Sequence, residues 1–248
     1  MSTTYSIDAT TLHNTDEFQF QILHPSCSSD LEESLLVLRQ SFFPLETVHR
    51  AVKASENPLA IDELEQLCRK TAQDSVSVIA REKSTGKICA TAFCKIQIKP
   101  SPGNPGSFDE IAASFKQPES LAIMDYMIQV DGKVDLFGQY STDTLYELMF
   151  LGTMPEYCGR HLGKDLTRAC LQVASQTSAG AVTILCTSPW TERIAAGLGF
   201  DLLYRGKTRE VSIEFKDKEG RSYADLFEED PEYTLRAYPL PCTNDTKL

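Results

Sequence analysis

The sequence has no long apolar run. None of its stretches approaches the roughly 18 apolar residues that a membrane-spanning helix needs. Residues 1–18 also lack the basic region and apolar core of a secretory signal. The sequence therefore predicts a cytoplasmic protein that does not bind membranes.

Clustered metal ligands and excess positive charge are absent too. No two of the eight cysteines have C-x-x-C spacing and only four histidines are present, so we expect no metal site and free thiols in a reducing compartment. The formal net charge of −11 argues against nucleic-acid binding by general electrostatics and favours cationic partners. An anionic ligand would need local dipoles or a few local cations.

The hydrophobic pattern predicts the element order β, α, α, α, β, β, α, β, α, β, α, β, β. The predicted ranges are 18–25, 28–43, 46–52, 60–73, 75–82, 88–99, 119–140, 144–154, 163–176, 181–186, 191–198, 200–206 and 233–240. A further hairpin is expected within residues 209–232.

The early hairpin argues against an all-parallel sheet, whereas the alternation after residue 144 indicates a parallel portion. We therefore predict an α/β fold with a mixed central sheet and helices on both faces. One domain would cover residues 18–240, with a flexible N-terminus (1–17) and a C-terminal tail (241–248).

The segment "LGTMPEYCGRHLGKDL" (151–166) connects a predicted strand to a predicted helix. A helix N-terminus leaves backbone N–H groups unpaired and carries partial positive charge. Gly159 and Gly163 would let the backbone approach a diphosphate, and Arg160 and Lys164 would add positive charge. The pattern is neither a P-loop nor G-x-G-x-x-G. On its glycines alone, an ordinary strand–turn–helix connection is the favoured interpretation.

The six residues "CGRHLG" resemble the pyrophosphate loop of the GNAT superfamily of acetyl-CoA-dependent N-acetyltransferases, which often reads R-G-x-G-I-G. Cys158 stands at the arginine or glutamine position and Gly159 at the first glycine. His161 replaces the middle glycine, Leu162 matches the isoleucine, and Gly163 is the last glycine. The resemblance implies that residues 158–164 bind the pyrophosphate of acetyl-CoA.

The later segment "TERIAAGLGFDLLYR" (191–205) resembles the helix–strand element of the same superfamily, which often ends in K-L-G-F. The resemblance implies a sheet of about seven strands that splay at the cofactor site. It also implies a stretch that pairs with the pantetheine arm and supplies N–H groups to an oxyanion, namely Phe150, Leu151, Gly152 and Thr153.

Within the superfamily, "FFPLETVH" (42–49) is similar to the F-F-x-D-E-P-L-N motif of invertebrate arylalkylamine N-acetyltransferases. Glu46 falls on the glutamate, while His49 replaces the asparagine. "CTSPWT" (186–191) resembles the C-S-S-x-Y-S motif of that branch. The resemblance implies direct acetyl transfer to a small primary amine in a ternary complex, with dopamine, serotonin, octopamine or tryptamine as examples of the amine.

Such an amine has a pKa of about 10 and must lose a proton before it attacks a thioester. Glu46 is the predicted base, and its alternative role is to open a helix, where a carboxylate suits the dipole. Ser188 and Thr191 are candidates to protonate the leaving thiolate, with helix capping as the favoured alternative. Phe43 and Trp190 are candidates for the amine pocket, and core packing is their alternative.

Departures from the family pattern keep other functions open. Cys158, His161 and Ala195 (where many relatives have a tyrosine) motivate a non-catalytic CoA-binding or interaction protein. Acetylation of a polyamine or of a protein amine is the other alternative. In either catalytic case we expect a monomer whose partner is the amine.

Overall fold

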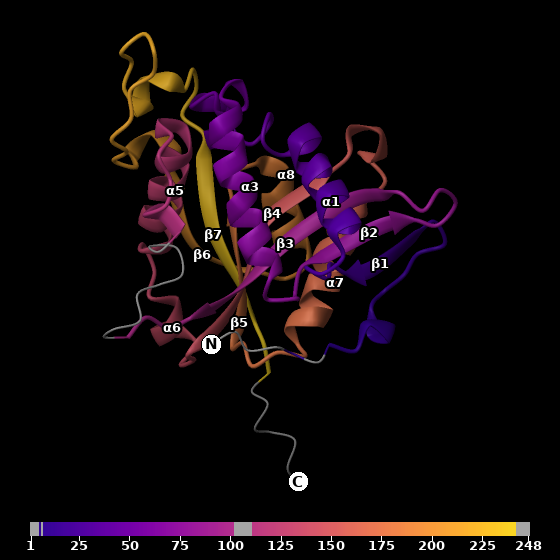
Figure 1. Cartoon of the computed structure of the whole chain (residues 1–248). Helices are drawn as coiled ribbons and strands as arrows, with labels where there is room; N and C mark the ends of the chain where they lie inside the picture. Colours follow the sequence, from indigo (N-terminus) through magenta and orange to yellow (C-terminus); the bar gives the residue numbers. More distant parts are fainter. Residues whose placement is uncertain (1–4, 6, 102–110, 242–248) are drawn as a thin grey trace.

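A computed structural model describes residues 5, 7–101 and 111–241 of the chain. Its centre is a seven-stranded sheet with the spatial order β1-β2-β3-β4-β5-β7-β6 (Figure 1). The strands are β1 (Phe18–Ile22), β2 (Val78–Glu82), β3 (Ile88–Ile98), β4 (Thr144–Thr153), β5 (Ala181–Cys186), β6 (Asp201–Lys207) and β7 (Glu232–Pro239). Among the described strands, β4 and β5 form a parallel pair and every other adjacent pair is antiparallel. The predicted mixed sheet is confirmed.

Helices cover both faces of the sheet. The helices are α1 (Ser28–Ser41), α2 (Thr47–Ala51), α3 (Pro58–Ala72), α5 (Pro118–Asp131), α6 (Leu136–Gln139), α7 (Leu162–Ala174) and α8 (Pro189–Gly197). Short 3-10 turns are η1 (Ala9–Thr11), η2 (Ala54–Glu56), η3 (Pro155–Tyr157), η4 (Thr208–Glu210) and η5 (Tyr223–Leu226). Buried side chains of α1, α3 and α5 share one core, and those of α7 and α8 share the core of the opposite face. The element order matches the prediction except that the helix predicted over residues 119–140 is divided into α5 and α6.

The hairpin predicted within residues 209–232 is present in a short form. Lys216 and Ser222 form an antiparallel bridge, and the N–H groups of Asp217 and Tyr223 donate to the carbonyls of Arg221 and Phe215, each at 3.1 Å. The rest of the segment forms η4 and η5 instead of long strands. Val211, Phe215 and Phe227 are buried in the core that includes α5.

Residues ahead of β1, in the segment predicted to be flexible, lie against α7. The backbone N–H of His13 donates to Gln172 Oε1 at 2.8 Å, and Leu12 is buried. The seven cysteines of the described residues are free thiols, as predicted, and Cys242 lies outside the described residues.

Across residues 5, 7–101 and 111–241, no helix combines the length and apolarity needed to cross a bilayer. The same residues contain no group of three or more histidine, cysteine, aspartate or glutamate side chains that could hold a metal ion.

Candidate active site

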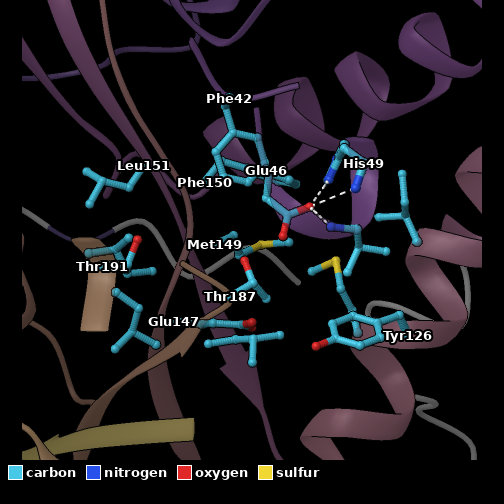
Figure 2. Close-up of a pocket in the computed structure, with 16 residues that line it drawn as sticks. Phe42, Glu46, His49, Tyr126, Glu147, Met149, Phe150, Leu151, Thr187 and Thr191 are labelled. Atoms are coloured by element: carbon cyan, nitrogen blue, oxygen red, sulfur yellow. Dashed lines mark hydrogen bonds and ion pairs between the residues drawn. The ribbon is translucent and has the colours of Figure 1, made fainter. Parts of the chain in front are cut away.

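The two parallel strands separate partway along their length. β4 and β5 pair over three positions, ending at Leu148 and Ile184, although β4 continues to Thr153. A pocket that is open to solvent lies where they part (Figure 2). Its lining residues are Phe42, Glu46, Val48, His49, Ile123, Tyr126, Met127, Glu147, Leu148, Met149, Phe150, Leu151, Ile184, Leu185, Thr187 and Thr191. The predicted splay is therefore present.

Glu46 enters this pocket from the turn between α1 and α2. It is the N-cap of α2, with extended backbone angles, and its Oε2 accepts the N–H groups of Val48 and His49, each at 2.9 Å. A carboxylate in this position satisfies N–H groups that the helix leaves unpaired and suits its dipole. Glu46 thus opens a helix, as its alternative interpretation held, but that interpretation placed the side chain in solvent and the structure buries it.

The second oxygen of Glu46 has different surroundings. The side chain is 8% exposed, and Oε1 is buried with no hydrogen-bond partner among the described residues. Figure 2 shows that the bonds of Glu46 all end on one oxygen, while the other points toward Thr187. A ligand with N–H donors would satisfy Oε1.

Burial raises the pKa of Glu46, but the hydrogen bond and charge of His49 oppose it and the net pKa lies below the ordinary value of 4.5. The Thr187 hydroxyl also lowers this pKa, although it does not have the geometry of a hydrogen bond to Oε1. Glu46 is therefore an anion at neutral pH, inside a largely apolar pocket that attracts a cation.

The two adjacent phenylalanines of the α1 end take different positions. Phe42 lines the pocket and meets Phe150 edge-to-face, with ring centroids 5.4 Å apart. Phe43, the residue predicted to bind substrate, is 1% exposed and packs in the core against the His49 ring. The structure therefore places Phe43 in the core, which was the alternative to a role in substrate binding.

The β5–α8 loop supplies the opposite wall. Thr191 lines the pocket, and its hydroxyl lies 2.9 Å from the hydroxyl of Ser188. Ser188 is the N-cap of α8 and accepts the Thr191 N–H at 3.2 Å. Trp190 is 71% exposed beneath the Arg193 guanidinium and is not a lining residue. The structure thus brings Thr191 to the pocket and leaves Ser188 as a cap.

Sequence reasoning missed Glu147 and Tyr126. Glu147 lies in β4 and is 7% exposed, and its Oε2 accepts a hydrogen bond from Gln97 at 2.6 Å. Burial outweighs the effects of Gln97 and Lys95 and raises the pKa of Glu147 to about 7. Tyr126 of α5 is buried against the same pocket. The sequence signal for Glu147 was its charge, because it stands alone inside the apolar strand "TLYELMFLGT".

The loop before α7 is built for close approach by a ligand. Gly159 has φ +82° and His161 has φ +61°, so both adopt the left-handed conformation that favours glycine. The backbone N–H groups from Gly159 to Gly163 donate to no described residue. Leu162 is buried and anchors the loop. His161 therefore keeps the backbone path expected of glycine, at some conformational cost.

Residue 163 also lies in close contact with α8. A Cβ atom there would lie 3.2 Å from Ile194 Cδ1, so α8 sits directly against the first turn of α7. Gly152 is similar, because a Cβ would lie 2.7 Å from Ser41 Oγ at the end of α1. Phe150 and Leu151 reach the pocket, whereas Gly152 and Thr153 continue β4 toward the loop.

Arg160 is turned away from the loop interior. It forms an ion pair with Glu17 and lies 4.8 Å from the centroid of the Phe18 ring. Lys164, in contrast, has no ion pair with any residue that the structure describes. Cys158 is exposed. An anion at this helix terminus would thus meet unpaired N–H groups and Lys164.

Comparison with known proteins gives a likeness in structure only. No protein-family model matches the sequence, and no curated protein matches it either. Arylalkylamine N-acetyltransferase 2 from Aedes aegypti superimposes with a TM-score of 0.74 at 20% identity, covering 90% of this chain and 99% of that one. Putative arylalkylamine N-acetyltransferase 7 from the same mosquito gives 0.76 at 16%, covering 96% and 93%.

A Drosophila melanogaster polyamine N-acetyltransferase, which catalyses the formation of N-acetylagmatine, gives a TM-score of 0.73 at 17% identity, covering 90% of this chain and 100% of that one. At these identities the likeness establishes the fold. The chain has the GNAT fold that the sequence resemblance implied.

Proposed function

We propose that this protein is an acetyl-CoA-dependent N-acetyltransferase that acts on a small primary amine. The observation that carries the proposal is the unpartnered Oε1 of Glu46, buried in a pocket where β4 and β5 part. β4 lines the pocket at Phe150 and Leu151 and then leads toward the loop before α7, where the N–H groups of residues 159–163 donate to no described residue. Together they would offer an anion for an amine and donors for a diphosphate. The GNAT fold of amine acetyltransferases supports the same assignment.

In this proposal acetyl-CoA binds along the opening between the strands. The N–H groups of residues 159–163 and the Lys164 ammonium hold the pyrophosphate. The pantetheine arm pairs with β4 at residues 150–153, where the strand no longer pairs with β5. The thioester then lies at the pocket mouth. We propose that the reaction needs no metal and that the enzyme is monomeric and cytoplasmic.

The chemistry requires the amine to be deprotonated. The ammonium binds Glu46 Oε1 and gives its proton to that oxygen, directly or through water. The freed nitrogen lone pair attacks the thioester carbon, and backbone N–H groups of β4 (Phe150, Leu151 and Gly152) stabilise the oxyanion. Collapse of this intermediate breaks the C–S bond. The CoA thiolate leaves unassisted while the amide nitrogen releases its second proton to water, or the Thr191 hydroxyl relays that proton from the nitrogen to the sulfur.

The lining of the pocket favours an arylalkylamine. Phe42 and Phe150 present aromatic rings beside Glu46, and most other lining residues are apolar. A polyamine is a second candidate because Glu147 is a second carboxyl group in the same pocket. Its negative form would pair with a distal ammonium of such a substrate.

An acetylation assay with thiol release as the readout tests the proposal. The panel contains tyramine, dopamine, serotonin, octopamine and tryptamine together with spermidine and a peptide amine. We expect turnover of at least one arylalkylamine, and a large loss of kcat in Glu46→Gln with acetyl-CoA affinity retained. Turnover of spermidine alone would favour the second candidate. Binding of acetyl-CoA without turnover of any amine would indicate a non-catalytic protein.

A further inference from the structure

His49 is a buried ionisable residue that the reaction described above does not use. It is 3% exposed, and its ring packs against those of Phe42 and Phe43, at centroid distances of 5.2 and 5.7 Å. Its Nδ1 is 2.6 Å from Glu46 Oε2. Its Nε2 is buried and has no partner among the described residues. Among the residues that the structure describes, Glu46 is therefore the polar partner of the His49 ring.

This contact defines the form of the imidazole ring. A carboxylate oxygen only accepts hydrogen bonds, so Nδ1 must carry the proton when Glu46 is ionised. Phe43 stacks on the ring and Phe42 meets it edge-to-face, and this packing holds Nδ1 toward the carboxylate. The donor is thus set in place before any substrate binds.

The contact also divides the carboxylate into two parts. Oε2 receives three donors, the N–H groups of Val48 and His49 and the His49 ring. Oε1 receives none and is the oxygen on the pocket side (Figure 2). Rotation of the carboxylate would break all three bonds at once.

We propose that His49 is a positioning residue whose Nδ1–H group holds Glu46 as an anion with Oε1 toward the pocket, ready for the ammonium group of the substrate. The role given to Oε1 rests on the proposed function. His49 does not touch the substrate in this account. It acts through Glu46 alone.

The sign of the electrostatic effect follows from the neighbours of the carboxylate. Burial raises the pKa of Glu46, and the His49 contact is the largest opposing influence. Tyr126 from α5 and Tyr223 from η5 face the carboxylate, but burial raises the pKa of each phenol, so both stay neutral. Glu147 from β4 lines the same pocket and adds negative charge when ionised. Without the His49 donor, burial prevails and the pKa of Glu46 rises.

Three variants of His49 separate this role from simple packing. His49→Asn keeps an N–H donor near the position of Nδ1. His49→Leu has a similar volume but no donor, and His49→Gln moves the donor toward the position of Nε2. We expect the Asn variant to stay within about threefold of the wild type. We expect the Leu and Gln variants to raise KM for the amine at least tenfold without changing acetyl-CoA affinity.

The first measurement is a carboxyl titration by NMR with ¹³C-labelled glutamate, in which the Glu46→Gln variant assigns the Glu46 signal. The wild type and the Asn variant should titrate below the ordinary glutamate value, and the Leu or Gln variant above it. Equal midpoints in all of these proteins would overturn the proposal. This titration needs no turnover, so it remains decisive even if no amine is acetylated.

The second measurement is the pH dependence of kcat/KM, made also in a Glu147→Gln background because Glu147 ionises in the same pocket. The acid limb should move to higher pH by one unit or more in the Leu and Gln variants. A loss of activity in the Asn variant as large as in the Leu variant, with no movement of the limb, would show a merely structural role. Should the Leu variant fail to fold, the Gln variant carries the same comparison.

Discussion

The two carboxylate oxygens of Glu46 have different roles. Oε2 closes the first turn of α2, and Oε1 lies unpartnered in the pocket. A residue that caps a helix is held in one orientation, because rotation would leave backbone N–H groups unpaired. The capping role therefore supports the chemical role, and the same side chain provides both.

Glu147 gives a prediction about pH and stability. Its pKa is raised from 4.5 to about 7 by burial, so between these values the folded state binds more protons than the unfolded state. Stability should fall as pH rises through this window. We expect Glu147→Gln to be more stable than the wild type at about pH 8, by up to roughly 3 kcal/mol. The difference should shrink toward about pH 5.

Chemical denaturation of both proteins across this pH range measures the effect. Glu228→Gln, in the exposed acidic loop, removes the same formal charge without burial and serves as the control. A stability difference between the wild type and Glu147→Gln that does not vary with pH would contradict the prediction.

For single residues, the sequence indicates which motif forms the site better than it indicates the direction in which each side chain points. Glu46 and Thr191 lie in the pocket, as their motifs indicated. Phe42 takes the place predicted for Phe43, because successive residues at a helix end point about 100° apart and small rotations decide which one faces a pocket. Trp190 lies in the first turn of α8, where the direction of each side chain also depends on the rotation of the helix, and it points into solvent.

Among the elements, the first turn of α7 is the most specialised. The N–H groups of Leu162 and Gly163 donate to no residue that the structure describes, and the close contact with α8 leaves little room for a side chain at position 163. Strand, loop and helix follow each other here in the order that the sequence indicated. The left-handed backbone at His161 was not predictable from its side chain, because a non-glycine residue rarely adopts it.

Gly163→Pro tests the anion site in this turn. Proline is tolerated in the first turn of a helix but removes one N–H donor. We expect acetyl-CoA affinity, measured by calorimetry, to fall at least tenfold while the protein still folds. Gly163→Ala is the matched control, since it keeps the donor and adds a Cβ that meets only the flexible end of Ile194. Equal losses of stability and affinity in the proline variant would argue against the site.

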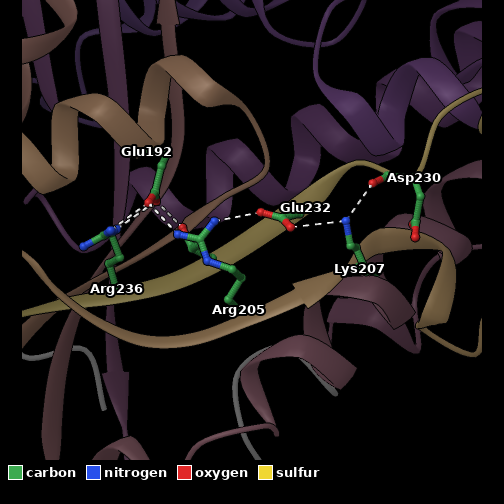
Figure 3. Close-up of polar contacts among 7 residues, drawn as sticks. Glu192, Arg205, Lys207, Asp230, Glu232 and Arg236 are labelled. Atoms are coloured by element: carbon green, nitrogen blue, oxygen red, sulfur yellow. Dashed lines mark hydrogen bonds and ion pairs between the residues drawn. The ribbon is translucent and has the colours of Figure 1, made fainter.

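An ion-pair network joins α8 to β6 and β7 (Figure 3). Arg236 of β7 is 11% exposed at its side chain and donates to Glu192 of α8 at 2.7 Å and to the Phe200 carbonyl at 2.7 Å. Arg205 of β6 is 47% exposed and pairs with Glu232. The buried arm of this network fixes the helix that carries Thr191 against the far half of the sheet.

The two arginines should differ in their effect on stability. Arg236→Met leaves Glu192 largely buried without its main partner, and we expect a loss of about 3 kcal/mol. Arg205→Met breaks an exposed pair, and we expect a loss below about 1 kcal/mol. Denaturant unfolding of both variants provides the comparison. Similar losses would show that burial of the pair has no particular role.

For the whole molecule, the order of elements was readable but the order of strands in space was not. The sequence indicated that the last two strands pair. Only the structure shows that β7 inserts between β5 and β6. Local patterns define each strand, whereas its neighbour in the sheet depends on contacts between residues far apart in the chain, such as Ile184 beside Arg236.

The net charge of −11 acts on the two proposed substrates in opposite directions. An ammonium substrate is attracted to the molecule and acetyl-CoA is repelled, and salt screens both effects over a Debye length of about 10 Å at 0.1 M. Raising sodium chloride from about 20 to 200 mM should lower kcat/KM for the amine several-fold and raise it for acetyl-CoA. Steady-state kinetics at matched pH measures both, with potassium acetate as a second salt to exclude specific ion binding. If both constants move in the same direction, the overall field does not steer these substrates and local contacts alone set their affinity.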